Sequence, residues 1–259
     1  MLNALLAPRA RTLSLGCVLP HACVLPGAVA GAASAPPCLA EVRLDSLFPA
    51  TDVEFIELAG PAGLPLDGYA LVVLGDADED ESGLALGDSG VVESVIHLDG
   101  LAIPDDRALL IHSSGLLLVP PDAVATLALE DLDNLTVLLV AGATCVPGDD
   151  LDLDDDGTLD VPGWKSIVDG VSFVQATEGA LSEWTYAPTR VESDGGWFVL
   201  AARRCLDTGA WLAEGPALDL DGADTPGAPN APCAGWLCTA DITSDGRVDA
   251  ADLAVLLGD

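Results

Sequence analysis

From residue 41 onward the chain consists of short runs in which apolar and polar residues alternate, separated by turns rich in Gly, Pro and Asp. Alternation with a period of two buries one face of a strand and leaves the other toward solvent. Eight runs fit strands: 42–47, 54–58, 69–74, 91–98, 108–112, 135–141, 167–174 and 197–201. We find no long amphipathic helix that could serve as the crossover of a parallel α/β sheet. The pattern therefore predicts a mainly β protein, an antiparallel sandwich.

The run at 54–58 also predicts which face is buried. Alternation places Phe55 with Glu57 on one face and Ile56 with Leu58 on the other,. Because Ile56 and Leu58 form the more consistent apolar pair, we expect that pair to point inward. The candidates for the inner face are Phe55, Ile56, Leu58, Tyr69, Leu71 and Val73.

Composition adds a strong acidic bias to this picture. The chain carries 42 Asp and Glu against 9 Lys and Arg, a formal net charge of −33, while 50% of its residues are hydrophobic. The hydrophobic share supplies enough material for a core and argues against general disorder. An acidic surface repels nucleic acid and anionic membranes and attracts divalent cations. The alternative for the charge is a solvated acidic face, as in proteins adapted to salt.

The first 35 residues differ from the rest in their order of basic, apolar and small residues. Arg9 and Arg11 precede an apolar, uncharged stretch that ends in small residues, and Ala28–Ala30 and Ala33–Ala35 both fit a small-x-small cleavage rule. This pattern is typical of a secretion signal, with lipidation of Cys17 as an alternative. No later segment reaches the ~18 uninterrupted apolar residues of a membrane-spanning helix. We therefore expect a leader at 1–35, a main domain at 36–230, a tail at 231–259, and a secreted or cell-surface location.

The cysteines do not pair completely. Seven are present, and removal of the leader leaves Cys38, Cys145, Cys205, Cys233 and Cys238. An odd number excludes full intramolecular pairing. Cys233 and Cys238 bracket a short segment and are candidates for a local disulfide. Zinc is a weaker alternative because no His or further thiol lies near them.

The C-terminal run 241–252 has the spacing of a twelve-residue calcium loop. Oxygen-bearing side chains stand at positions one, three, five, nine and twelve, Gly246 stands at position six for the sharp turn, and position seven offers a backbone carbonyl. The predicted ligands are Asp241, Thr243, Asp245, Arg247 (carbonyl), Asp249 and Asp252. Residues 250–257 continue as a short apolar-striped helix. The alternative is an acidic tail that binds no ion.

A second acidic loop repeats the first half of this pattern. With Asp152 at position one, Asp stands at positions one, three, five and nine and Gly157 at position six. Position twelve is Gly163, so the closing carboxylate is missing, and Asp169 or a carboxylate from another loop would have to replace it. The predicted ligands are Asp152, Asp154, Asp156, Thr158 (carbonyl) and Asp160. The alternative is a solvated acidic insertion.

Catalytic signatures are missing from the sequence. Only His97 and His112 follow the leader, each in or at the end of a predicted strand, where histidine is usually structural or exposed,. No G-x-S-x-G, phosphate-binding glycine loop or H-E-x-x-H occurs,. The abundance of acids prevents a catalytic carboxylate pair from being singled out. We therefore expect a protein that is not an enzyme.

Two family resemblances follow from these motifs. Residues 241–252 resemble one type I dockerin repeat, with Thr243 in place of the usual Asn or Asp and a single repeat present, which implies modest calcium affinity and a cohesin-like protein partner,. Residues 41–44, 52–58, 65–71 and 224–230 resemble the two ends of a bacterial lamin-tail domain, and Arg203-Arg204 falls where such domains often carry Arg. This second resemblance implies an immunoglobulin-like sandwich used for binding or anchoring, without catalytic residues.

Together these features favour an exported, calcium-binding module that presents a sandwich to a protein or glycan partner. One alternative is a calcium-rigidified adhesion or structural protein of the cell surface. Another is an accessory domain of an extracellular hydrolase system.

Overall fold

The computed structural model of this chain describes residues 35–44, 54–75, 89–113, 119–129, 134–175, 184–192, 199–205, 207–214 and 225–230. Within these ranges the protein is built from β-strands and contains no helix. The strands are β1 Cys38–Arg43, β2 Phe55–Ala59, β3 Tyr69–Gly75, β4 Val91–His97, β5 Ala108–His112, β6 Ala123–Val124, β7 Leu135–Ala141, β8 Ser166–Val174, β9 Arg190–Glu192, β10 Ala201–Arg204 and β11 Trp211–Glu214. The predicted mainly β class is confirmed.

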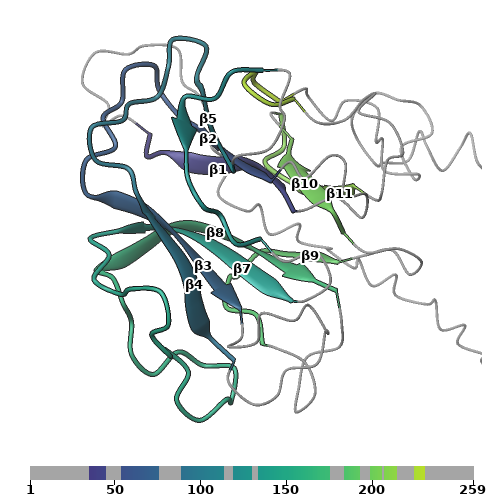
Figure 1. Ribbon diagram of the computed structural model, residues 1–259. Coiled ribbons are helices and arrows are strands. Elements are labelled where there is room, and N and C mark those ends of the chain that lie inside the picture. Colours follow the sequence, from purple (N-terminus) through teal and green to yellow (C-terminus); the bar gives the residue numbers. More distant parts are fainter. Residues whose placement is uncertain are drawn as a thin grey trace, which may run out of the picture.

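The strands form two sheets that lie one above the other (Figure 1). One sheet has the order β11-β10-β1-β2-β5-β6 and the other the order β4-β3-β7-β8-β9. Most neighbours are antiparallel, but β5 pairs with β6, and β8 with β9, in parallel. Both sheets are therefore mixed, and the expectation of a purely antiparallel sandwich is wrong at these two edges.

The main core lies between the sheets. Ile56 and Leu58 on β2 meet Leu71 and Val73 on β3 there, all of them fully buried. The predicted inward orientation of Ile56 and Leu58 is confirmed. Phe55, also named as an inner-face candidate, instead lies on the outer face of its sheet, where it packs with Leu110. Phe55 and Glu57 are nevertheless buried, so this outer face is covered as well.

A second core covers the outer face of the five-stranded sheet. Val72 and Val140 point to this side and pack with Leu151, Trp164 and Tyr186 from the loops that follow β7 and β8. A strand buried on both faces reads as a continuous apolar run. This double burial explains why residues 69–74 and 135–141 are almost uninterrupted in their hydrophobicity.

Two predicted strands are displaced along the chain. The run expected at 42–47 is replaced by β1, which begins at Cys38, because a bulge between Leu39 and Glu41 breaks the alternation while keeping Leu39 and Val42 in the core,. Residues 45–47 lie outside the described ranges. The last predicted run, 197–201, overlaps β10 only at Ala201. The short strands β6, β9 and β11 were not predicted.

Several predicted features fall outside the described residues: the leader through residue 34, Cys233 and Cys238, and the C-terminal loop with its ligands. Cys205 is disulfide-bonded. Among the described residues, no helix is long and apolar enough to cross a membrane.

Candidate metal site

The acidic loop at 150–160 is part of a longer connection between β7 and β8 that packs against the body of the protein. Leu151 is buried in the second core, and Leu159 and Trp164, which follow Asp156 in the chain, pack against that core. Backbone hydrogen bonds join Leu151 to Gly90 before β4 and Asp160 back to Leu151. The base of the loop is therefore part of the second core, while residues 153–156 of the acidic run are exposed.

The carboxylate of Asp152 organises the turn. Its Oδ1 accepts the backbone N–H of Asp156 at 3.2 Å and its Oδ2 accepts that of Gly157 at 2.8 Å. Gly157 adopts a φ of +85°, which favours glycine, and a Cβ there would lie 2.9 Å from the indole of Trp184,. Asp155, at position four, also has a positive φ of 52°. The D-x-D-x-D-G sequence thus folds into a tight turn around the first carboxylate.

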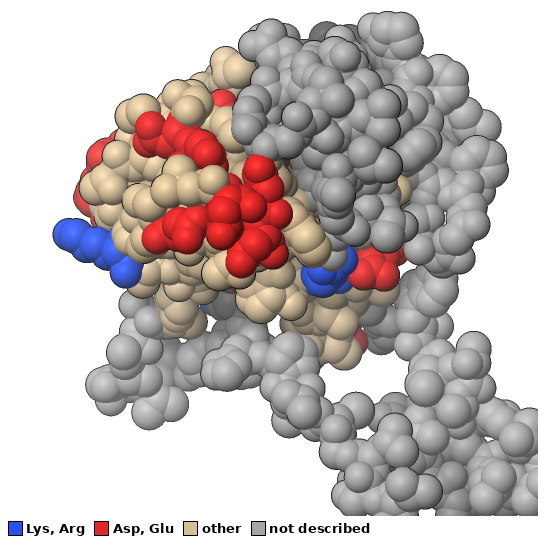
Figure 2. Space-filling model, turned by 90° about the horizontal axis from the view of Figure 1, so that it is seen from below, with Lys and Arg blue, Asp and Glu red and all other residues tan. Residues whose placement is uncertain are grey.

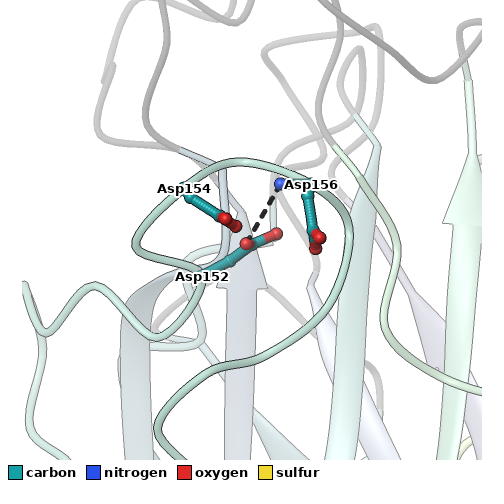
Figure 3. Close-up of side chains that lie close together, drawn as sticks. All are labelled: Asp152, Asp154 and Asp156. Carbon is teal, nitrogen blue, oxygen red and sulfur yellow. Dashed lines mark hydrogen bonds between the residues drawn. The ribbon is translucent and has the colours of Figure 1, made fainter.

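This turn brings the first three predicted carboxylate ligands together (Figure 3). One oxygen of each of Asp152, Asp154 and Asp156 lies within 4.8 Å of the other two. Asp152 is fully buried at the base of the cluster, whereas Asp154 and Asp156 are exposed. The arrangement offers oxygen ligands from three alternate residues to one position, as a hard cation requires.

Like charges within the cluster disfavour the ionised form of Asp154. The pKa of Asp154 is raised above its ordinary value, chiefly by the negative charge of Asp156, with smaller contributions from partial desolvation and from Asp160. Figure 2 shows acidic side chains gathered in one patch on the face of the molecule seen from below the sheets. A bound cation would remove this repulsion.

The remaining predicted ligands are less closely placed. Asp160 uses its Oδ2 to accept the N–H of Leu153 at 2.9 Å and does not belong to the three-carboxylate group. Thr158, predicted to offer its carbonyl, lies exposed within the loop.

Asp169 does not close the site. On β8, its two oxygens accept bonds from Arg204 Nη2 at 2.8 and 2.7 Å. Asp169 is thus engaged in a structural ion pair, and the suggestion that it supplies the closing carboxylate is not supported.

Sequence reasoning missed three residues that hold the loop in place. Tyr186 donates its hydroxyl to Asp152 Oδ2 at 2.8 Å, Trp184 donates its indole N–H to the carbonyl of Asp155 at 2.9 Å, and the N–H of Ser89 is bound by Asp155 Oδ1 at 2.7 Å. Burial, first of all, raises the pKa of Tyr186, so its hydroxyl keeps its proton. These contacts span 29 to 66 residues, and no local pattern could reveal them.

The segment that carries Trp184 and Tyr186 is itself fastened to the five-stranded sheet. Thr136 on β7 and Ser172 on β8, both fully buried, accept the N–H groups of Tyr186 and Ala187 at 3.0 Å each. The position of the first carboxylate is therefore fixed by the sheet through Tyr186.

Comparison of the chain with protein-family models, with curated proteins and with solved structures finds no match.

The two histidines within the described residues lie at the ends of strands. His97 is exposed at the end of β4. His112 is buried at the end of β5, and its Nδ1 contacts the carbonyl of Ser113. Both fit the structural or exposed roles expected from their strand positions.

Proposed function

We propose that this chain is an exported, non-enzymatic module that binds calcium and presents a β-sandwich to a protein or glycan partner. The observation that carries the proposal is the convergence of Asp152, Asp154 and Asp156 within a turn that is held by partly buried hydrogen bonds to Asp152. The D-x-D-x-D-G spacing supports calcium over softer metals, which favour Cys or His ligands.

The ligand set we propose follows the positions of the loop. Asp152, Asp154 and Asp156 supply carboxylate oxygens, Thr158 supplies its carbonyl, and Asp160 acts directly or through water. Because position twelve lacks a carboxylate, we expect a dissociation constant on the order of 0.1–1 mM, the range of extracellular calcium modules. Binding should weaken as pH falls, because protons compete for the same carboxylates.

The wider assignment extends the resemblances found in the sequence. We propose that the two sheets are an immunoglobulin-like sandwich of the lamin-tail type, and that residues 241–252 form a second, dockerin-like calcium loop. The support for the first is that Glu57 of the E-F-I-E-L motif, on β2, accepts the N–H of Gly227 of the T-P-G-A-P-N motif at 225–230. The anchoring function then combines a sandwich with a calcium-dependent tail.

Calcium titration by calorimetry on the full chain should report two independent sites. Asp154→Asn combined with Asp156→Asn should remove one, and Asp241→Ala combined with Asp252→Ala should remove the other, because each pair deletes ligands from one loop only. Asp105→Asn, an exposed acid in a turn before β5, serves as the control and should leave both sites. Unchanged stoichiometry in both double variants would exclude the assignment.

The anchoring part of the proposal predicts a calcium-dependent partner. Immobilised protein should retain a protein or glycan from extracellular surface extracts in calcium and release it in chelator. The two double variants then identify which loop the interaction requires. Retention that is equal in calcium, in chelator and in both variants would contradict a calcium-dependent anchor.

A further inference from the structure

Residues 225–230 lie on the outer face of the six-stranded sheet, far in sequence from the strands they cover. The segment begins with a β-turn in which the N–H of Ala228 donates to the carbonyl of Thr225 at 2.9 Å. Pro226 and Gly227 occupy the centre of the turn, and the φ of Gly227 is +73°. Proline followed by glycine with positive φ is the pattern of a type II turn. The Pro226-Gly227 pair therefore favours this turn through its local sequence alone.

Two buried glutamates on adjacent strands hold the turn. Glu41 on β1 and Glu57 on β2 stand opposite each other in the strand register, and both are fully buried. Glu41 accepts both the N–H and the hydroxyl of Thr225, the latter at 2.8 Å. Glu57 Oε2 accepts the N–H of Gly227 at 2.8 Å. The two carboxyl groups therefore act as paired acceptors for the same turn.

Asn230 fastens the other end of the segment. It is buried, and its Nδ2 donates to the carbonyls of Ala40 at 2.8 Å and Arg204 at 2.9 Å. Its Oδ1 lies 2.6 Å from the hydroxyl of Thr225, which joins the two ends of the segment. Residues 225–230, named here the clasp, are thus held to the six-stranded sheet at both of their ends.

The surroundings of Glu57 disfavour its charge. Its Oε1 is buried and has no hydrogen-bond partner among the described residues. Burial first of all, then the negative charges of Glu41 and of Asp106 in the turn before β5, raises the pKa of Glu57 to about 8, and these effects outweigh the opposite effect of the N–H groups of Gly227 and Ala228. On the far side of Glu41, Arg203 on β10 stands opposite that glutamate in the register. Asp122, beside β5, directs its carboxylate to the N–H of Leu110.

The neighbouring row of the same face carries two further titratable or charged groups. Arg43 on β1 and His112 on β5 flank Phe55 in the register. The two arginines therefore lie on β1 and β10. Glu57 itself, on β2, is close to two other acids, Glu41 and Asp106.

We propose that residues 225–230 form a proton-dependent clasp, in which uncharged Glu57 allows the turn to dock beside Glu41 and ionised Glu57 releases it. Opening the clasp exposes Glu57 to water and returns its carboxyl toward ordinary acidity, so closing takes up a proton. Closure is therefore strongest below the ordinary pKa of 4.5 and weakens as pH rises toward the closed-state value of about 8, beyond which it stays constant,. The clasp thereby makes the docking of residues 225–230 on the six-stranded sheet sensitive to pH.

Amide hydrogen exchange of Gly227 in the full chain tests this directly, after correction for the pH dependence of the intrinsic exchange rate. In the native protein the protection factor should fall by up to about tenfold per pH unit from about pH 5 to about pH 8 and then level off. In Glu57→Gln, which retains an acceptor but cannot ionise, the protection should not change with pH. Glu192→Gln, at an exposed glutamate of β9, is the matched control and should keep the native slope.

A flat profile in the native protein, or an identical slope in Glu57→Gln, would overturn the proposal. If Glu57→Gln does not fold, carbon NMR of the Glu57 carboxyl in the native protein decides the matter. A titration midpoint near 8 together with the loss of Gly227 protection supports the clasp, whereas a midpoint near 4.5 overturns it.

Discussion

Replacing Arg204 by methionine should lower the free energy of unfolding by about 3–5 kcal/mol, the cost of leaving one member of a buried ion pair without its partner. Arg204 on β10 and Asp169 on β8 link the two sheets, with side chains only 12% and 16% exposed. Asp169 Oδ2 also accepts the N–H of Leu39 on β1 at 2.9 Å, and the guanidinium lies 5.1 Å from the ring centroid of Trp211. Methionine would keep most of the packing but leave the buried carboxylate of Asp169 without its cationic partner.

Urea unfolding followed by circular dichroism measures this loss. Arg190→Met is the control, because Arg190 and Glu192 form a far more exposed pair, at 38% and 62%, whose removal should cost less than about 1 kcal/mol,. The double variant Arg204→Met with Asp169→Leu should be more stable than Arg204→Met alone, because it also removes the buried, unpaired charge of Asp169. A loss in Arg204→Met no greater than in the control would contradict the structural importance of the pair.

In the absence of calcium, Asp152→Ala should destabilise the protein by roughly 2–4 kcal/mol, whereas Asp154→Ala should not. The Asp152 carboxylate is fully buried and accepts three donors: the N–H groups of Asp156 and Gly157 and the hydroxyl of Tyr186. Alanine would leave these donors without an acceptor beside the second core. Asp154 is fully exposed, and its removal relieves repulsion by Asp156.

The same two variants should behave alike toward calcium, since each would lose a proposed ligand. Unfolding in chelator and in excess calcium separates the effects, because an ion that binds only the folded state stabilises it in proportion to the logarithm of its excess. We expect the gain in the free energy of unfolding that calcium gives through this loop to be lost in both variants. The free energy of unfolding measured in chelator should fall only in Asp152→Ala. Equal stability of the two variants in chelator would show that Asp152 does not organise the turn.

The apolar pattern determined much of the architecture. Alternation at 54–58 correctly predicted that Ile56 and Leu58 enter the main core, and the runs at 69–74, 108–112 and 135–141 all became strands. The D-x-D-x-D-G spacing likewise predicted a tight turn that gathers Asp152, Asp154 and Asp156. These features are local, because a strand's inward face and a turn's hydrogen bonds depend on residues only a few positions apart.

Only the tertiary structure decided which groups meet across the chain. Phe55 packs with Leu110 and Val119 on the outer face of its sheet, and Glu57 accepts the N–H of Gly227 there. Arg204 binds the carboxylate of Asp169, which therefore does not join the three-carboxylate group. Tyr186 reaches Asp152 because the segment after β8 crosses the outer face of the five-stranded sheet. Each contact joins residues far apart in sequence, and its presence depends on strand order and on which loops cover each sheet. Those choices minimise the exposed apolar area of the whole molecule, a quantity that no short window of sequence contains.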